Sequence, residues 1–153
     1  VFCVGLKTKE LLNENGFTVE AYTGYAEDLA EIITLVYSDE SFTFFSGNLR
    51  RDTLPEMLSE NEITFNEIKV YDTTLTPQKI SEKVDGILFF SPSAVTSYLK
   101  KNTLTNEKLF CIGNTTADSL RAVLSETKIK NIKTAYQPSV DNVIEQVIEY
   151  YNK

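Results

Sequence analysis

The sequence predicts two similar α/β half-molecules, each built on a parallel sheet. The first observation is an internal repeat: residues 1–8 read VFCVGLKT, and residues 109–116 read LFCIGNTT. The second observation is that strand patterns alternate with helical patterns along the chain, which is typical of βαβ units. A repeat made of strand, helix, strand and helix is too long for a solenoid, so we interpret it as a half-molecule.

Short apolar or β-branched runs mark the expected strands. The run at 86–90, Gly-Ile-Leu-Phe-Phe, is apolar throughout, as expected of a parallel strand that is covered on both faces. Apolar residues at helical spacing mark helices between the strands, most clearly over 26–37 and 140–151. In chain order the expected strands are 1–4, 18–21, 42–46, 65–71, 86–90, 108–112 and 133–135.

Several expected helix starts carry a capping signal. Thr53, with Glu56 three residues later, matches a capping box. Thr76 and Ser91 are each followed by a proline, which is favoured at the first helical position. Ser139 is the expected N-cap of the last helix. Some hydroxyl groups of the chain are therefore explained by helix capping alone.

The polar, β-branched stretch before Pro77 is the one segment with the composition of a linker. We therefore predict one lobe over residues 1–72, an interdomain linker over 73–77 and a second lobe over 78–153. The chain begins at Val1, inside an expected strand and without an initiator methionine. We expect it to be a fragment or a partly observed protein.

Composition excludes several classes of function. The formal net charge of −7 disfavours a broad nucleic-acid-binding surface, and the absence of histidine excludes His-based triads and His metal ligands. Cys3 and Cys111 occupy equivalent places in the repeat and are expected to be small core residues. No apolar run approaches the roughly 20 residues of a membrane span, and no signal peptide is apparent. These features favour a protein of the reducing cytoplasm.

Polar groups follow four of the expected strands, where ligands collect in doubly wound sheets. Helix N-termini with N–H groups, hydroxyls and cations suit a carboxylate or a phosphate. No turn matches a phosphate-binding loop, and Gly-x-Gly-x-x-Gly is absent. The candidate residues in these turns are Thr8; Ser46, Gly47, Asn48 and Arg50; Ser91 and Ser93; and Gly113, Asn114, Thr115 and Thr116.

Each candidate also has an explanation that involves no ligand. Ser91 and Asn114 are explained as helix caps, and Arg50 as a solvated surface cation. Tyr71, at the end of a strand beside the linker, is explained as a packing aromatic. The paired threonines lie past the cap position and are harder to explain in this way. The residues alone therefore predict a two-lobed α/β protein with anion-binding turns, but they do not name its ligand.

Four motifs follow one another along the chain: FFSGNLRRDTLP at 44–55, VYDT at 70–73, FFSPSAV at 89–95 and IGNTTA at 112–117. In this order and spacing they resemble the uroporphyrinogen-III synthase family, and the resemblance covers essentially the whole chain. Each motif by itself is weak, but the ordered set is fairly specific. The resemblance implies two flavodoxin-like lobes joined by two linker segments, with the active site in the cleft between the lobes.

The resemblance also implies a reaction. Members of the family are lyases of heme biosynthesis that cyclise hydroxymethylbilane, a linear tetrapyrrole with eight carboxylates, invert its last ring and release water. They use no metal and no cofactor, and the full-length protein is expected to be a monomer without nucleic-acid or membrane partners. By matching position, Tyr71 is the candidate proton donor to the leaving hydroxyl, because a phenol stays protonated at neutral pH. The candidate turn residues are assigned to substrate binding.

The chain departs from the family at its start. Family members have a further strand–helix–strand and a Phe-Thr-Ser type turn before the segment that begins here at Val1. Without them, the first lobe would lack its middle strand and the second its first two, which leaves backbone groups unpaired. We expect the missing part to be unobserved or removed after folding, rather than replaced by strand exchange between chains. We do not expect the isolated piece to be active. We expect self-association of this piece, but not of the full-length protein.

Two other functions stay open at this point. A non-catalytic bilobal module that binds a tetrapyrrole or another poly-anion would use the same scaffold, because a fold does not settle a function. Tyr71 and the paired threonines favour the enzyme. A generic flavodoxin-like or response-regulator domain is disfavoured by the repeat and by the absence of an acidic pocket after the first strand.

Overall fold

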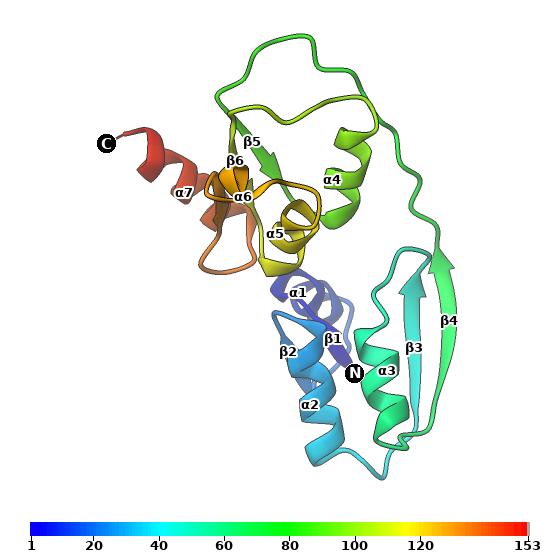
Figure 1. Ribbon diagram of the computed structural model, residues 1–153. Coiled ribbons are helices and arrows are strands. Elements are labelled where there is room, and N and C mark those ends of the chain that lie inside the picture. Colours follow the sequence, from blue (N-terminus) through cyan, green and yellow to red (C-terminus); the bar gives the residue numbers. More distant parts are fainter. Residues whose placement is uncertain (153) are drawn as a thin grey trace. The chain divides into compact units, whose positions relative to one another are not determined.

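The computed structural model describes residues 1–152, which form two compact units (Figure 1). We call Val1–Thr73 lobe A and the chain from Thr74 onward lobe B. Each lobe has its own parallel strands and its own apolar core. Both are therefore α/β units, as predicted. No helix in residues 1–152 combines the length and the apolar character that a membrane crossing requires.

Lobe A contains two separate two-stranded parallel sheets, β1–β2 and β3–β4. The longer sheet pairs Phe42 with Phe65 at one end and Gly47 with Tyr71 at the other. In chain order the elements are β1 (Phe2–Val4), α1 (Leu6–Glu14), β2 (Ala21–Thr23), α2 (Ala26–Val36), β3 (Phe42–Gly47), α3 (Thr53–Glu60) and β4 (Phe65–Tyr71).

The core of lobe A lies between helices α2 and α3 and one face of the strands. Leu29 and Ile33 of α2 are buried with Leu58 of α3, and Phe44 of β3 packs against them. Helical spacing of apolar residues in α2 produces this stripe, and each fully buried aliphatic side chain contributes about 1.5–3 kcal/mol. Packing on this face fixes β3 and β4, whose carboxyl ends carry several of the predicted site residues.

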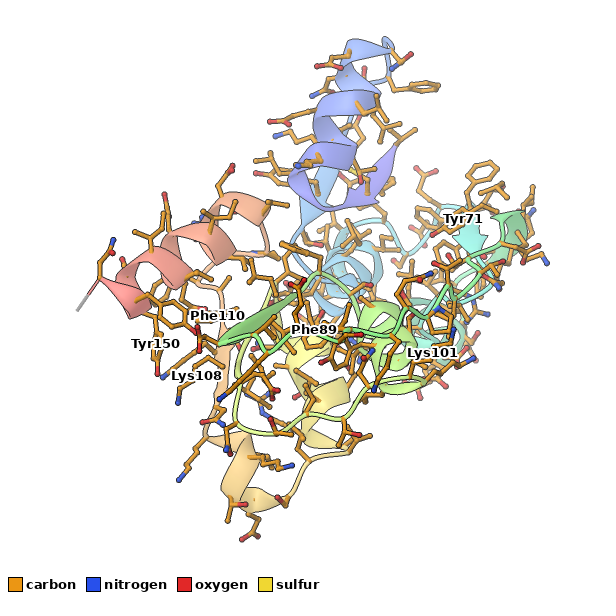
Figure 2. All side chains as sticks on the ribbon, turned by 90° about the horizontal axis from the view of Figure 1, so that it is seen from above. Tyr71, Phe89, Lys101, Lys108, Phe110 and Tyr150 are labelled. Carbon is orange, nitrogen blue, oxygen red and sulfur yellow. The ribbon has the colours of Figure 1, made fainter. Side chains whose placement is uncertain are left out.

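Lobe B contains one three-stranded parallel sheet in the order β5–β6–β7. Its central strand is buried: Leu109 and Cys111 face one core cluster with α4 and α5, and Phe110 faces another with Val143 of α7. The ring of Phe110 lies 5.8 Å from that of Tyr150, edge to face (Figure 2). In chain order the elements are β5 (Gly86–Phe89), α4 (Pro92–Leu99), β6 (Lys108–Cys111), α5 (Asn114–Arg121), α6 (Glu126–Ile129), β7 (Ile132–Thr134) and α7 (Val140–Tyr151).

Two of the predicted capping signals are confirmed. Ser91 precedes α4, and its hydroxyl accepts a hydrogen bond from the Ala94 N–H at 3.1 Å. Ser139 precedes α7 and accepts from the Asn142 N–H at 3.2 Å. The buried, free thiols of both cysteines also confirm their predicted place in the cores. Local patterns thus predicted these features correctly.

Two other capping signals were wrong. Thr53 is the first residue of α3, and Asp52 occupies the N-cap without a side-chain capping bond, because its carboxylate pairs with Arg50. Thr76 begins no helix: residues 72–84 contain neither helix nor strand. The buried side chain of Asn102 accepts from the Ile80 N–H at 2.8 Å and donates to the Gln78 carbonyl at 2.7 Å, and these tertiary contacts hold the segment.

The second expected strand was also misplaced. It was predicted over 18–21, and β2 runs over Ala21–Thr23. The reason is the register with β1, in which Phe2 lies opposite Ala21 and Val4 lies opposite Thr23. Position 18 is instead held by its backbone carbonyl, which accepts a hydrogen bond from the nitrogen of Val1 at 2.7 Å.

Candidate active site

Most of the predicted site residues lie at the ends of strands or just after them, at the edge where parallel strands end together. In lobe A the register places Gly47 directly opposite Tyr71, so the turn after β3 and the end of β4 meet. In lobe B the turns after β5 and β6 follow paired strands and reach the same edge of one sheet. Thr8 is different, because it belongs to the helix that follows β1, whose sheet is separate from β3–β4.

Tyr71 rests on the turn that begins at Gly47. A Cβ atom added at Gly47 would lie 2.3 Å from the ring atom Cε2 of Tyr71 and 2.8 Å from its phenolic oxygen. Only glycine permits this close approach of a ring to the backbone. Tyr71 nevertheless remains 61% exposed at the end of β4 (Figure 2). The ring of the tyrosine thus packs on the backbone of Gly47, and Tyr71 is not a core residue.

Ser46 and Arg50, on either side of this glycine, share one partner that sequence analysis missed. The hydroxyl of Ser46, which is only 5% exposed, donates to Oε1 of Glu67 at 2.6 Å. Arg50 donates to both carboxylate oxygens of Glu67, with Nη2 2.8 Å from Oε2, and its Nη1 pairs with Asp52. The only sequence signal for Glu67 is the two-residue period that places positions 67 and 69 on one face of β4.

The electrostatics of this network follow from its hydrogen bonds. Bonds from Arg50, and then from Ser46, lower the pKa of Glu67 to about 2. Bonds to Glu67, and then to Asp52, raise the pKa of Arg50 still further above its usual range. Glu67 is therefore ionised at neutral pH, and the charge of the guanidinium is balanced within the protein. The alternative explanation of Arg50 as a simple solvated cation therefore leaves out its two carboxylate partners, Glu67 and Asp52.

Asn48 connects the same turn to the chain that leaves β4. Its Oδ1 accepts from the Thr73 N–H at 2.7 Å, and its Nδ2 donates to the Thr73 carbonyl at 3.2 Å. The Asn48 N–H also donates to the Tyr71 carbonyl at 3.2 Å. Both ends of the amide are thus committed to backbone groups, and the turn after β3 is tied to β4 along its length.

A shallow depression of about 290 Å³ borders Arg50 on its other side. Besides that arginine, its walls include Asp52, Glu56 and Glu60. Three carboxylates around one paired guanidinium repel an anion. This depression is therefore unsuited to a substrate rich in carboxylates, whatever the role of the neighbouring turn.

In lobe B, helix α5 begins without a side-chain cap. Gly113 is its N-cap residue, in extended conformation, and Asn114 is the first helical residue, so Asn114 does not cap the helix as one interpretation predicted. Thr115 and Thr116 complete the first turn, and Thr116 is only 2% exposed. The first-turn N–H groups and the positive end of the helix dipole make this turn suitable for a carboxylate.

The other copy of the repeat also begins its helix after a glycine, although the backbone at that glycine differs. Gly5 is the N-cap of α1 with φ of 93°, no side chain caps the helix, and Thr8 occupies the place that Thr116 has in α5. Thr8, however, is exposed. The turn after β5 differs from both, because Ser91 caps α4 and its hydroxyl lies 2.9 Å from that of Ser93.

No group of three His, Cys, Asp or Glu side chains in residues 1–152 is placed to hold a metal ion. Burial raises the pKa of Cys111 to about 11 and also raises that of Cys3, so both thiols are protonated at neutral pH. These cysteines are structural residues.

Comparison with known proteins agrees with the resemblance seen in the ordered turns. A uroporphyrinogen-III synthase of Chlorobaculum parvum is 27% identical over 136 residues, covering 78% of this chain and 55% of the relative. The chain thus spans about half the length of that curated relative. The crystal structure of uroporphyrinogen-III synthetase from Helicobacter pylori 26695 is similar in fold, with a TM-score of 0.65 at 22% identity, over 95% of this chain and 67% of that one.

The structural similarity confirms the predicted α/β fold class. The family model described as uroporphyrinogen-III synthase HemD matches residues 1–145, which is nearly the whole chain. The sequence motifs, the parallel sheets and this match all lead to one conclusion. The chain belongs to the uroporphyrinogen-III synthase family.

Proposed function

We propose that the full-length protein cyclises hydroxymethylbilane to uroporphyrinogen III, with inversion of the last ring and loss of water, as a lyase of tetrapyrrole biosynthesis. The observation that carries this proposal is the family match over residues 1–145. Two features of the lobes support it: the exposed phenol of Tyr71 in lobe A and the start of α5 in lobe B, which no side chain caps.

Binding of the substrate requires local sites for its eight carboxylates, because the chain as a whole is acidic. Helix N-termini provide such sites without a basic surface. In this proposal the start of α5, with Gly113, Asn114, Thr115 and Thr116, binds one or more carboxylates. Thr8 at the start of α1, and the hydroxyls of Ser91 and Ser93 before α4, are further donors for carboxylates or pyrrole rings.

The chemical step needs little from the protein beyond shape and one proton. Tyr71 donates its phenolic proton to the hydroxyl of the bilane, the carbon–oxygen bond breaks, and the hydroxyl leaves as water. A bound conformation that brings the two ends of the tetrapyrrole together makes the carbon–carbon bond formation effectively unimolecular. The exposed position of Tyr71 is compatible with this role, since its side chain is not buried in the core of lobe A.

The Thr116→Val variant tests the binding role of α5. Valine has nearly the same shape as threonine at this buried position but cannot donate a hydrogen bond. Because a hydrogen bond to a charged group is worth about 1.5–3 kcal/mol, KM for the bilane is expected to rise about tenfold or more. Thr96→Val is the matched control, because the Thr96 hydroxyl binds only the Pro92 carbonyl within α4. Unchanged affinity and rate in Thr116→Val would contradict the assignment.

The proposed reaction is tested by supplying the full-length protein with freshly generated hydroxymethylbilane. The products are oxidised, and the uroporphyrin isomers are separated and quantified. Mainly type III isomer is expected, and a reaction without protein gives the background of type I from unassisted closure. If the protein yields only type I, the synthase proposal is wrong, and binding of the bilane without turnover then becomes the next measurement.

We also propose a cellular compartment and an oligomeric state for the enzyme. Cys3 and Cys111 are the two cysteines of the chain, and both are buried free thiols, which suits a reducing compartment such as the cytoplasm. We propose a monomeric full-length protein whose partner is the small-molecule substrate.

A further inference from the structure

The β3–β4 sheet of lobe A brings the carboxylate of Glu67 close to the turn that supports Tyr71. The side chains at positions 67 and 69 of β4 share one face with that of Ser46, because strand residues alternate between faces. Glu67 is paired with Phe44, and Ser46 is paired with Lys69, so Glu67 and Ser46 are diagonal neighbours on that face. Their hydrogen bond of 2.6 Å is this diagonal contact.

The pairing changes just beyond Ser46. The register shifts between Ser46 and Gly47, so Gly47 lies opposite Tyr71 and not opposite Val70. The ring of Tyr71 then lies against the backbone of Gly47. A residue with a Cβ atom at position 47 would not allow this close approach. The position of this backbone therefore decides where the phenol lies, and whatever holds the turn holds the tyrosine.

Glu67 holds the turn from both sides. Ser46, directly before Gly47, donates to one carboxylate oxygen, and Arg50, at the end of the turn, donates to both. Bidentate and charge-assisted hydrogen bonds of this kind are the strongest and the most restrictive in geometry. We propose that Glu67 is a positioning residue for Tyr71, which acts through Ser46 and Arg50. This inference rests on the proposed function.

The same contacts assign a role to Arg50. Its Nε and Nη2 face Glu67, and its Nη1 faces Asp52, so the guanidinium already binds two carboxylates of the protein. A substrate carboxylate would have to displace one of them. In this proposal Arg50 and Ser46, which sequence analysis assigned to the substrate, serve to fix the turn, and Asn48 serves the same purpose through Thr73.

The test is a double-mutant cycle that joins Glu67→Gln to Tyr71→Phe in the full-length protein. Glutamine keeps one oxygen acceptor but loses the charge and the second acceptor for Arg50. In the wild-type background kcat for type III formation is expected to fall about tenfold, with KM changed less than about twofold, because the phenol is displaced while the binding sites remain. In the Tyr71→Phe background the same substitution is expected to leave kcat unchanged.

A purely structural role of Glu67 predicts a different pattern, in which Glu67→Gln lowers kcat by the same factor in both backgrounds. That result, with mainly type III isomer from the wild type, would overturn the positioning role alone. Type I isomer alone from the wild type would instead overturn the proposed function. Full activity of Tyr71→Phe would also overturn the inference, because Glu67 would then have no catalytic phenol to position.

Two further variants sharpen the cycle. Asp118→Asn removes a carboxylate that pairs with Arg121 at 2.7 Å on the exposed face of α5, and it is expected to leave both kinetic constants unchanged. If Glu67→Gln fails to fold, Ser46→Ala breaks the other bond to the same carboxylate. The Ser46→Ala variant is expected to lower kcat in the wild-type background and not in the Tyr71→Phe background, and equal losses in both would overturn the proposal.

Discussion

The Tyr71→Phe variant of the full-length protein is expected to form uroporphyrinogen III at least about 100 times more slowly than the wild type. General acid catalysis typically contributes about 10²–10⁴-fold to a rate, and phenylalanine removes the only proton that the side chain can donate. The ring itself stays, so its contact with Gly47 is kept. Because Tyr71 is largely exposed, stability and KM are expected to change little.

The measurement is the initial rate of type III formation at saturating bilane, with the thermal midpoint recorded on the same preparation. Tyr136→Phe is the matched control, since Tyr136 is a tyrosine of lobe B that is 83% exposed and has no assigned role in the reaction. It is expected to retain the wild-type rate. Near-normal turnover of Tyr71→Phe would exclude the phenol as the proton donor, and catalysis would then rest on binding and conformation.

The Gly47→Ala variant is expected to lower the rate by a similar factor, about 100-fold, without a comparable loss of stability. The new methyl group overlaps the ring of Tyr71, with a separation of 2.3 Å from Cε2, so the ring must move. It can do so at little cost, because it is the exposed end of a side chain, and the backbone at Gly47 does not have a positive φ. A displacement of about 1 Å at a reacting group can cost about 10²-fold in rate.

Kinetics and thermal unfolding of Gly47→Ala separate this effect from general damage. The double variant with Tyr71→Phe is expected to be no slower than Tyr71→Phe alone, since both changes remove the same proton donor. Gly86→Ala is the matched control: its methyl group would meet the Tyr151 hydroxyl at 2.9 Å in lobe B, so its cost is expected in stability and not in the rate of folded protein. A Gly47→Ala variant with full activity would show that the position of the ring does not matter.

Features that depend on neighbouring residues were readable from the sequence. The alternating run of β4 predicted its bounds over 65–71, and Ser91 and Ser139 were recognised as caps because an N-cap bonds to an N–H only three residues away. Thr53 and Thr76 carried similar signals and misled. Thr53 fails as a cap because Asp52 occupies the N-cap position with its carboxylate paired to Arg50. Thr76 fails because Asn102, distant in the sequence, holds the segment after Pro77.

In the candidate site, too, some features were predicted from the sequence and others were seen only in the structure. The sequence by itself determined the two α/β lobes, the turns that follow the strands, the family and the candidate status of Tyr71, because these depend on apolar periodicity, turn chemistry and ordered motifs. Only the tertiary structure revealed the contact of Tyr71 with Gly47, the neutralisation of Arg50 and the presence of Glu67 beneath the turn. These depend on which residues face one another across β3 and β4, and the register shift after Ser46 changes that pairing without any mark in the local pattern of residues.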